Sequence, residues 1–559
     1  MDACVPAHPL LGGKRQMSIA PDHHDTIIIG AGVAGIYQLK RLIDMETDVL
    51  LLEADDDLGG TWYRNRYPGC RFDSESYTYG YSFSKELLNE WHWKERFSSQ
   101  PENLKYLNYV AEKFGLREHM QFNARVARMV WDEEARLWHI HLSSGKAYTA
   151  RFVITGLGVL SMPAKPTYPG MDTFEGQSFH SHHWPKDPVS LEGKRVGVVG
   201  TGASGVQIIS AIADKVAELK VFQRRPNWCS PLNNAPISEE QMDDIRARYD
   251  EIFAKCASSA GGFIHQVDHR GFNNFTPEER RAFWDELYDT PGFALLAGNF
   301  MEVFLDEAAN KELSDYVADR IRGRVNDPAL AEKLIPKDHG YGVQRVPLET
   351  NYYEVYNRDN VELVDVSETP IEAITKAGLQ TSQSHYDLDL IVYATGFDAI
   401  TGAYDHIDIT GIDGLKLKDK WRDNPQTYLG VMSAGFPNLI MVAGPQGASG
   451  SVNFPRAIES CANWITDLLQ HAKDNDMTRL ESDEEGEREW FQMVVQMHER
   501  LLFRTSKSWF TGYNSNVRGD ASQTQNTDVR YNVFWGGALI YNTFLTEAQA
   551  QGYKRIKMD

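Results

Sequence analysis

Two glycine-rich segments with identical spacing are the residues of this sequence best suited to bind a phosphate-bearing ligand. TIIIGAGVAG at residues 26–35 and VGVVGTGASG at residues 196–205 both contain the pattern GxGxxG after an apolar run. Glycines at these positions let the backbone approach a pyrophosphate, which then meets the unpaired N–H groups at the start of the following helix. Each segment therefore predicts a dinucleotide site.

The residues that end the next strand of each unit differ in charge. The first unit ends at Glu53, whereas Gln223 occupies the equivalent position of the second and is followed by Arg224 and Arg225. A carboxylate accepts hydrogen bonds from ribose hydroxyl groups but repels a 2'-phosphate, which guanidinium groups bind in a bidentate manner. The first unit is therefore predicted to bind FAD or NAD, and the second NADPH.

Two dinucleotide sites in one chain predict electron transfer from a nicotinamide to a second nucleotide. A flavin is the expected acceptor, because it takes up a hydride and can then react with oxygen. The sequence contains no motif for haem or an iron–sulfur cluster.

The elements around these turns predict the α/β fold class, with two Rossmann-like dinucleotide-binding domains and a helical insertion in the second. Apolar strand patterns surround both turns and recur at 360–366 and 388–399, where a small-residue turn at 394–396 would let a cofactor approach. Capping boxes at 238–241 and 276–279 predict helices between them. The expected boundaries are an N-terminal extension at 1–24, the FAD-binding domain at 25–160 and 394–559, the NADP-binding domain at 161–234 and 341–393, and the helical insertion at 235–340.

Composition restricts the setting and the partners of the chain. Its 559 residues have a net charge of −21, so the overall field repels nucleic acid and anionic membranes. The five cysteines are scattered without a CxxC pair, which favours a reducing compartment. No signal peptide and no run of about 18 apolar residues is found. We expect a cytoplasmic monomer or weak homo-oligomer that binds small molecules.

The segment FEGQSFHSHHWP at residues 174–185 contains three histidines among aromatic side chains. A metal site is one interpretation, but it requires further ligands and an open position, so we expect no metal. A hydrophobic plug formed by Phe174 and Trp184 is a second interpretation. The third is a linker that moves one nucleotide domain relative to the other.

The same segment resembles the FxGxxxHxxxWP signature of class B flavoprotein monooxygenases, in the form found in type I Baeyer–Villiger monooxygenases. The matching positions are Phe174, Gly176, His180, Trp184 and Pro185. GGTWYRNRYPGCRFDSES, ATGFDA, AGP and SWFTG also resemble that family and occur in the same order, from about residue 25 to residue 557. The resemblance makes the segment an interdomain linker in which His180 acts through conformation and hydrogen bonding.

The resemblance implies an NADPH-dependent flavoprotein monooxygenase that inserts one oxygen atom from O2 next to a ketone carbonyl. The product would be an ester or lactone, formed through NADPH-reduced FAD and a C4a-peroxyflavin. Arg345 would stabilise the anions of the reaction, and Asp73 would hold Arg345 in position.

The resemblance also assigns cofactor contacts residue by residue. For FAD they are Gly30, Gly32, Gly35, Glu53, Thr61, Trp62, Tyr63, Arg64, Asp73, Tyr79, Val126 and Phe454. For NADPH they are Arg71, Phe72, Thr201, Gly202, Ala203, Ser204, Gly205, Val206, Gln207, Arg224, Arg225, Gln344, Arg345 and Trp509.

The sequence departs from the family pattern at several positions. Lys186 replaces a frequent Asp after the signature, and Gln344 replaces a frequent Lys beside Arg345, which predicts weaker discrimination for NADPH over NADH. The loop GPQGASGS, in particular 446–451, lacks the usual bulk and predicts room for bulky or cyclic ketones, and the run at 514–535 is longer and more polar than usual.

Two other functions remain as alternatives. One is a class B monooxygenase that oxygenates nitrogen or sulfur, and the other is a non-catalytic flavin-binding redox sensor. The natural ketone, the regiochemistry and enantioselectivity, and the oligomeric state do not follow from the sequence.

Overall fold

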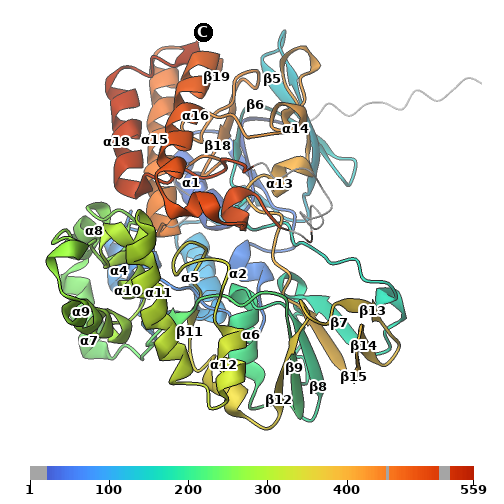
Figure 1. Ribbon diagram of the computed structural model, residues 1–559. Coiled ribbons are helices and arrows are strands. Elements are labelled where there is room, and N and C mark those ends of the chain that lie inside the picture. The colour runs from blue at the N-terminus through green and yellow to red at the C-terminus, as the bar shows by residue number, and fades with distance from the viewer. Residues whose placement is uncertain (1–21, 448–451, 515, 517–528) are drawn as a thin grey trace, which may run out of the picture.

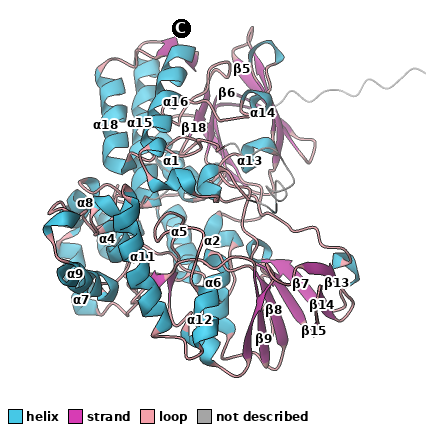
Figure 2. Cartoon of the chain, in the orientation of Figure 1, coloured by secondary structure: helices cyan, strands magenta, loops and turns pink. Residues whose placement is uncertain are grey.

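The computed structural model describes residues 22–447, 452–514, 516 and 529–559, and it contains two separate nucleotide-binding-type sheets with helices around them (Figures 1 and 2). The first sheet is formed by β1 (Asp22–Ile29), β2 (Val49–Leu52), β3 (Met120–Gln121), β4 (Val126–Asp132), β5 (Leu137–Leu142), β6 (Ala147–Thr155), β17 (Asp408–Thr410) and β18 (Leu439–Met441). The second is formed by β7 (Gln177–His180), β8 (Arg195–Val199), β9 (Glu218–Gln223), β12 (Val361–Asp365) and β16 (Leu390–Tyr393).

The first sheet has a parallel centre and an antiparallel side. Its order is β17-β4-β5-β6-β1-β2-β3, with β5 and β18 pairing with different parts of β6. β1 is parallel to both β2 and β6, and its apolar end is fully buried, as expected for a strand covered on both faces. The neighbouring helices are α1 (Val33–Asp44), α15 (Phe454–Asp474), α16 (Glu484–Glu499) and α18 (Gly537–Ala550). Of these, α15 packs against both α1 and α18.

The second sheet is parallel throughout, in the order β12-β9-β8-β16-β7. Helix α6 (Ala203–Ile212) follows β8 and packs against it. A small antiparallel sheet adjoins it, formed by β13 (Ile371–Ile374), β14 (Gly378–Thr381) and β15 (His385–Asp387). The strands that the sequence predicts at 360–366 and 388–399 are β12 and β16 of the parallel second sheet.

A helical region lies between β9 and β12 in the chain and beside both sheets in space (Figure 1, green to yellow). It contains α7 (Glu239–Ala247), α8 (Tyr249–Ala257), α9 (Pro277–Asp289), α10 (Ala294–Ala297), α11 (Glu307–Arg322) and α12 (Pro328–Leu334), and the strands β10 (Ser230–Pro231) and β11 (Leu348–Glu349) pair at its base. Both predicted capping boxes are confirmed, Ser238 with Gln241 and Thr276 with Glu279.

Shorter elements connect the two sheets and cover their ends. They are α2 (Thr61–Arg64), α3 (Ser76–Tyr79), α4 (Lys85–Glu90), α5 (Gln100–Lys113), α13 (Gly402–Asp405), α14 (Leu417–Lys420), β19 (Leu480–Ser482) and β20 (Ile556–Met558). No helix among the described residues is long and apolar enough to cross a membrane. The four cysteines of the described part of the chain are buried and free.

The segment 174–185, predicted to be an interdomain linker, contains a short strand. Gln177–His180 form β7, the edge strand of the second sheet, with Phe179 in register with Val392 of β16. The sequence does not reveal this strand, because its only partner lies more than 200 positions later in the chain. The middle of the segment is therefore part of the second sheet, and its role as an interdomain linker stays a prediction.

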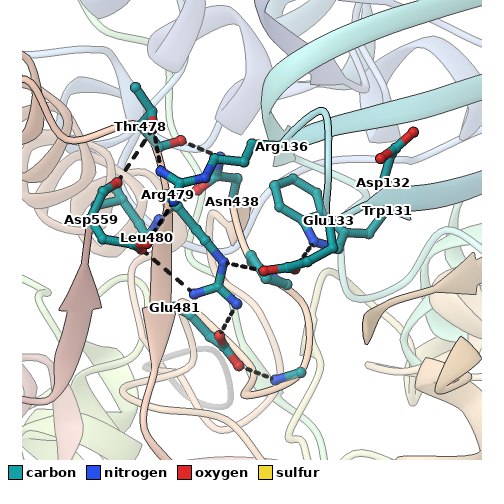
Figure 3. A network of polar contacts seen from close by, with 12 residues as sticks. Trp131, Asp132, Glu133, Arg136, Asn438, Thr478, Arg479, Leu480, Glu481 and Asp559 are labelled. Atoms are coloured by element: carbon teal, nitrogen blue, oxygen red, sulfur yellow. Dashed lines mark hydrogen bonds and ion pairs between the residues drawn. The ribbon is translucent and has the colours of Figure 1, made fainter. Parts of the chain in front are cut away.

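Residues 478–481 and Asp559 are linked to the β4–β5 end of the first sheet by a network of polar contacts (Figure 3). Arg479 forms ion pairs with Glu133 at 3.1 Å and with Glu481 at 2.7 Å. Glu481 is buried, and it also accepts a hydrogen bond from the backbone of Gly435 at 2.8 Å. Arg136 pairs with Asp559 at 2.9 Å in a more exposed position.

We expect Arg479→Leu to lower stability by about 3 kcal/mol, because it leaves the carboxylate of Glu481 buried without a counter-charge. Arg136→Leu is the matched control and should cost less than about 1 kcal/mol, because its pair is exposed. Thermal unfolding followed by flavin fluorescence measures both. Equal changes in Tm for the two variants would contradict the analysis.

Candidate active site

The first glycine turn is shaped to leave space for a ligand backbone. Gly30 has φ +103°, and a Cβ there would lie 2.7 Å from the carbonyl oxygen of Gly156. A Cβ on Gly35 would overlap the carbonyl oxygen of Gly30, so only glycine lets α1 pack this closely. Helix α1 begins after Gly32 without a side-chain cap, which leaves its first N–H groups available for an anion.

Glu53 lies at the end of β2, directly beside this turn. Its carboxylate accepts hydrogen bonds from the backbone of Ala31 at 2.7 Å and of Asp55 at 2.8 Å. Burial raises the pKa of Glu53, while hydrogen bonds from the backbone of Ala31 and Ala54 and the charge of Arg64 act in the opposite direction. The Glu53 carboxylate lies beside the glycine turn, where it could accept hydrogen bonds from the ribose hydroxyl groups of a dinucleotide. These residues therefore fit FAD.

The second glycine turn repeats this arrangement between β8 and α6. Gly200 has φ +106°, and a Cβ there would lie 2.5 Å from the carbonyl oxygen of Ala394. A Cβ on Gly205 would overlap the carbonyl oxygen of Gly200, whereas one on Gly202 would meet nothing within 4 Å. Gly202 thus faces open space at an uncapped helix start, which fits the pyrophosphate of NADPH.

A cavity of about 590 Å³ extends from this turn to the first nucleotide unit. Most residues predicted to contact NADPH line it: Arg71, Phe72, Thr201, Gly202, Ala203, Ser204, Gln207, Arg224, Arg225, Gln344, Arg345 and Trp509. Gly205 and Val206 do not, because they are buried in α6. The structure therefore brings together side chains from segment 61–73 of the first nucleotide unit, from the second sheet, from the helical insertion and from the segment around Trp509.

Arg345 and Asp73 meet in the wall of this cavity. Arg345 Nη2 donates to Asp73 Oδ2 at 2.7 Å, and its Nη1 donates to the carbonyl oxygen of Val346 at 2.7 Å. The guanidinium also lies over the ring of Phe293, 4.9 Å from its centre. Burial raises the pKa of the Asp73 carboxyl, and the charge of Arg345 opposes that rise. The two residues named from the sequence are thus in direct contact.

The remaining residues predicted for FAD lie around the first sheet. Thr61, Trp62, Tyr63 and Arg64 form α2, and Trp62 Nε1 donates to the hydroxyl of Tyr79 at 2.7 Å. Val126 begins β4 and Phe454 begins α15. Of the set predicted for FAD, Thr61 and Asp73 line the large cavity, while the others lie outside it.

The histidines of segment 174–185 bind to protein groups. His180 Nε2 lies 3.1 Å from the carbonyl oxygen of Gly396, and His182 Nδ1 lies 3.2 Å from Asn65 Oδ1. Burial, with His183 nearby, lowers the pKa of His180 to about 4 and that of His182 to about 3. Trp184 packs edge-on against Phe179. Within the described ranges, no group of three or more histidine, cysteine or acidic residues is placed to hold a metal.

Several residues of the cavity wall were not predicted. They are Asn65, Tyr67, Leu160, Tyr168, Pro226, Asn227, His339, Phe397, Ser508, Tyr513, Asn514 and Asn516. Asp338 organises part of this wall, because it pairs with Arg225 at 3.3 Å and with His339 at 2.7 Å. Asn514 and Asn516 donate to the carbonyl oxygen of Thr395 in the small-residue turn. Asn65, Tyr67, Phe397 and Ser508 lie within the motifs of the family resemblance, but no individual role was predicted for them.

Comparison with known proteins agrees with this geometry. Residues 24–235 match the family described as flavin-binding monooxygenase-like. The chain is 45% identical to 2-oxo-Delta(3)-4,5,5-trimethylcyclopentenylacetyl-CoA monooxygenase of Pseudomonas putida, over 90% of this chain and 93% of that protein. It is 39% identical to cyclohexanone 1,2-monooxygenase of Acinetobacter, over 88% and 90%. The crystal structure of OTEMO in complex with FAD and NADP superimposes with a TM-score of 0.91 at 43% identity, covering 96% and 99% of the two chains.

The two paired nucleotide turns and the cavity between them define a flavin-binding monooxygenase. The full-length similarity is more specific: the chain belongs to the Baeyer–Villiger monooxygenase family. The predicted family, fold class and cofactors, FAD and NADPH, are confirmed.

The buried histidines lead to a prediction about pH. Their pKa is lower in the folded chain than the ordinary value of 6.5, so the unfolded chain binds more protons below that pH, and stability rises with pH. Each of the two histidines should lower the free energy of unfolding by about 2 kcal/mol when the pH falls from 7 to 5. His182→Gln keeps a polar group near Asn65. In denaturant unfolding, its free energy of unfolding should fall by about 2 kcal/mol less than that of the wild type over the same pH change. Identical pH dependence would contradict the prediction.

Proposed function

We propose that this protein uses NADPH and O2 to convert a ketone into an ester or lactone. One oxygen atom enters the bond beside the carbonyl, and the other leaves as water while NADPH is oxidised. The observation that carries the proposal is the Asp73–Arg345 contact of 2.7 Å, in the wall of the cavity that holds the residues predicted for NADPH. The activity agrees with the one expected from the sequence and with the family.

The residues of this chain supply binding, orientation and charge. When bound, FAD accepts hydride from NADPH and provides the site at which O2 is activated. Arg345 presents a permanent positive charge to the negative oxygen that develops at the former ketone carbon. Asp73 binds that guanidinium, which also lies over the ring of Phe293, so its direction is set before the substrate binds. Both roles are proposals of ours.

We infer cyclic ketones as the substrate class. The Pseudomonas putida relative is named for a CoA-linked cyclopentenyl ketone and the Acinetobacter relative for cyclohexanone. The loop 446–451, for which the sequence predicts extra room, lies outside the described residues from position 448 onwards, as does much of the run 514–535. Neither loop therefore supports the inference, which depends on the relatives.

A ketone panel with purified protein tests the activity. Acetone, cyclohexanone and a bulky cyclopentenyl ketone, each with NADPH and 18O2, should show one labelled oxygen atom in an ester or lactone by mass spectrometry. A sulfide and an amine belong in the panel, because oxygenation of those alone would indicate a nitrogen- or sulfur-oxygenating enzyme. NADPH consumption that yields only hydrogen peroxide with every ketone would support a redox sensor.

Replacement of Arg345 tests the catalytic role. We expect Arg345→Ala to lower kcat for ester formation by about 100- to 1000-fold, since a charge directed at the transition state is lost. Arg345→Lys should recover little, because a compact ammonium lacks the planar fork whose two nitrogens bind Val346 and Asp73. Product quantification by gas chromatography measures both, with bound FAD as the control for folding. Wild-type ester formation by Arg345→Ala would refute the role.

A second prediction concerns the effect of Gln344 on the preference for NADPH over NADH. It lines the cavity together with Arg224 and Arg225, where a lysine would add charge facing a 2'-phosphate. Gln344→Lys should lower KM for NADPH about fivefold, or ~1 kcal/mol, and leave NADH unchanged. Gln344→Glu, of matched size, should raise KM for NADPH. Steady-state kinetics with both nucleotides decides, and equal selectivity in the two variants would exclude this position from phosphate binding.

A further inference from the structure

A buried histidine–glutamate pair joins the helical insertion to the segment that contains Asp73. His265 Nε2 lies 3.1 Å from Glu75 Oε1, and the two side chains are 11% and 3% exposed. The other carboxylate oxygen of Glu75 is buried and has no hydrogen-bond partner among the described residues. A buried carboxylate with one partner depends strongly on that partner, because an unpaired charge in such a place is costly.

The loop that contains His265 also contacts the helices of the first sheet. The carbonyl oxygen of Ala260 accepts a hydrogen bond from Ala538 at 2.6 Å, in α18. The carbonyl oxygen of Gly261 accepts one from Asn453 at 2.7 Å, directly before Phe454 and α15. Residues 259–265 are therefore one part of the insertion that contacts the first nucleotide unit.

A continuous series of contacts leads from this loop to the proposed catalytic arginine. The ring of Phe263 lies 5.0 Å from that of Phe293, and Phe293 lies 4.9 Å from the guanidinium of Arg345. Arg345 pairs with Asp73, which is two residues before Glu75. The contacts thus form a closed loop, because His265 is two residues after Phe263 and pairs with Glu75.

We propose that His265 is a positioning residue for Arg345. By pairing with Glu75 it fixes segment 73–75, whose Asp73 binds the guanidinium. It also fixes the loop that carries Phe263, whose ring packs against Phe293. Loss of His265 leaves the Glu75 carboxylate buried without a partner, and segment 73–75 moves to give that charge water or a proton. The proposal rests on the catalytic role of Arg345 given above, and it makes the helical insertion part of the machinery that aims this residue.

Four variants test it in the FAD-containing protein. His265→Ala should lower kcat for ester formation by about 10- to 100-fold, the range expected for a displacement near 1 Å. KM for ketone and NADPH, bound FAD and the dissociation constant of NADP+ should change less than about threefold, because His265 is absent from the cavity wall. His265→Gln keeps an N–H donor and should restore most of kcat.

The double variant Glu75→Gln with His265→Ala separates positioning from packing. A neutral amide needs no counter-charge, so the double variant should recover at least about threefold in kcat over His265→Ala alone. A cavity left by the missing imidazole would not be filled by this change. Failure of the second substitution to recover any activity would overturn the proposal.

The chain contains a matched control pair. His92 and Glu239 also join the segments before the second sheet to the insertion, with Nδ1 and Oε2 3.1 Å apart, but the Glu239 side chain is 85% exposed. His92→Ala should leave kcat and the ester yield per NADPH unchanged. A loss equal to that of His265→Ala, or a fully active His265→Ala with complete FAD content, would overturn the proposal.

The two proposals can fail separately. If the wild type forms no ester from any ketone, the proposed function falls, and the crystal structure of His265→Ala decides the positioning role. An Arg345–Asp73 contact that stays near the present 2.7 Å in that variant would overturn it. A displaced guanidinium would support it. If His265→Ala does not fold, His265→Gln and Glu75→Gln provide the same comparison of kcat and structure.

Discussion

The ion pair between Asp73 and Arg345 joins two segments that are more than 270 positions apart and places a guanidinium in the cavity wall. A buried carboxylate is stable as an anion only beside a fixed cation, so the pair requires both segments to be held firmly. The backbone of Val346, the ring of Phe293 and the insertion loop meet this requirement on the arginine side. The pair therefore depends on how the sheets and the insertion hold these segments.

The charge of the cavity contrasts with that of the whole molecule. The chain has a net charge of −21, yet Arg71, Arg224, Arg225 and Arg345 line one cavity. An anionic nucleotide is therefore attracted at short range, while most of the surface repels it. Asp338, which pairs with Arg225, keeps one of these side chains in a defined direction.

The sequence predicts the features whose signals are local. The glycine turns, Glu53 at the end of its strand and the two capping boxes each depend on residues within a few positions of one another. The edge strand β7, the Arg225–Asp338 pair and the Glu75–His265 pair depend on partners distant in the chain. A histidine in a polar loop has no periodicity or spacing that identifies its partner, so sequence reasoning passes over it. The pairing of Asp73 with Arg345 was expected only because of the family resemblance.

The division of the first sheet along the chain has a consequence for biosynthesis. β1 to β6 end at Thr155, but β17 and β18, which pair with β4 and β6, end only at Met441. During translation, the edge of β6 that pairs with β18 stays unpaired until the whole second sheet and the insertion have been synthesised. At ordinary elongation rates that interval is on the order of tens of seconds, in which the nascent chain presents an unpaired edge at the end of β6. Chaperone demand during synthesis thus follows from strand order alone.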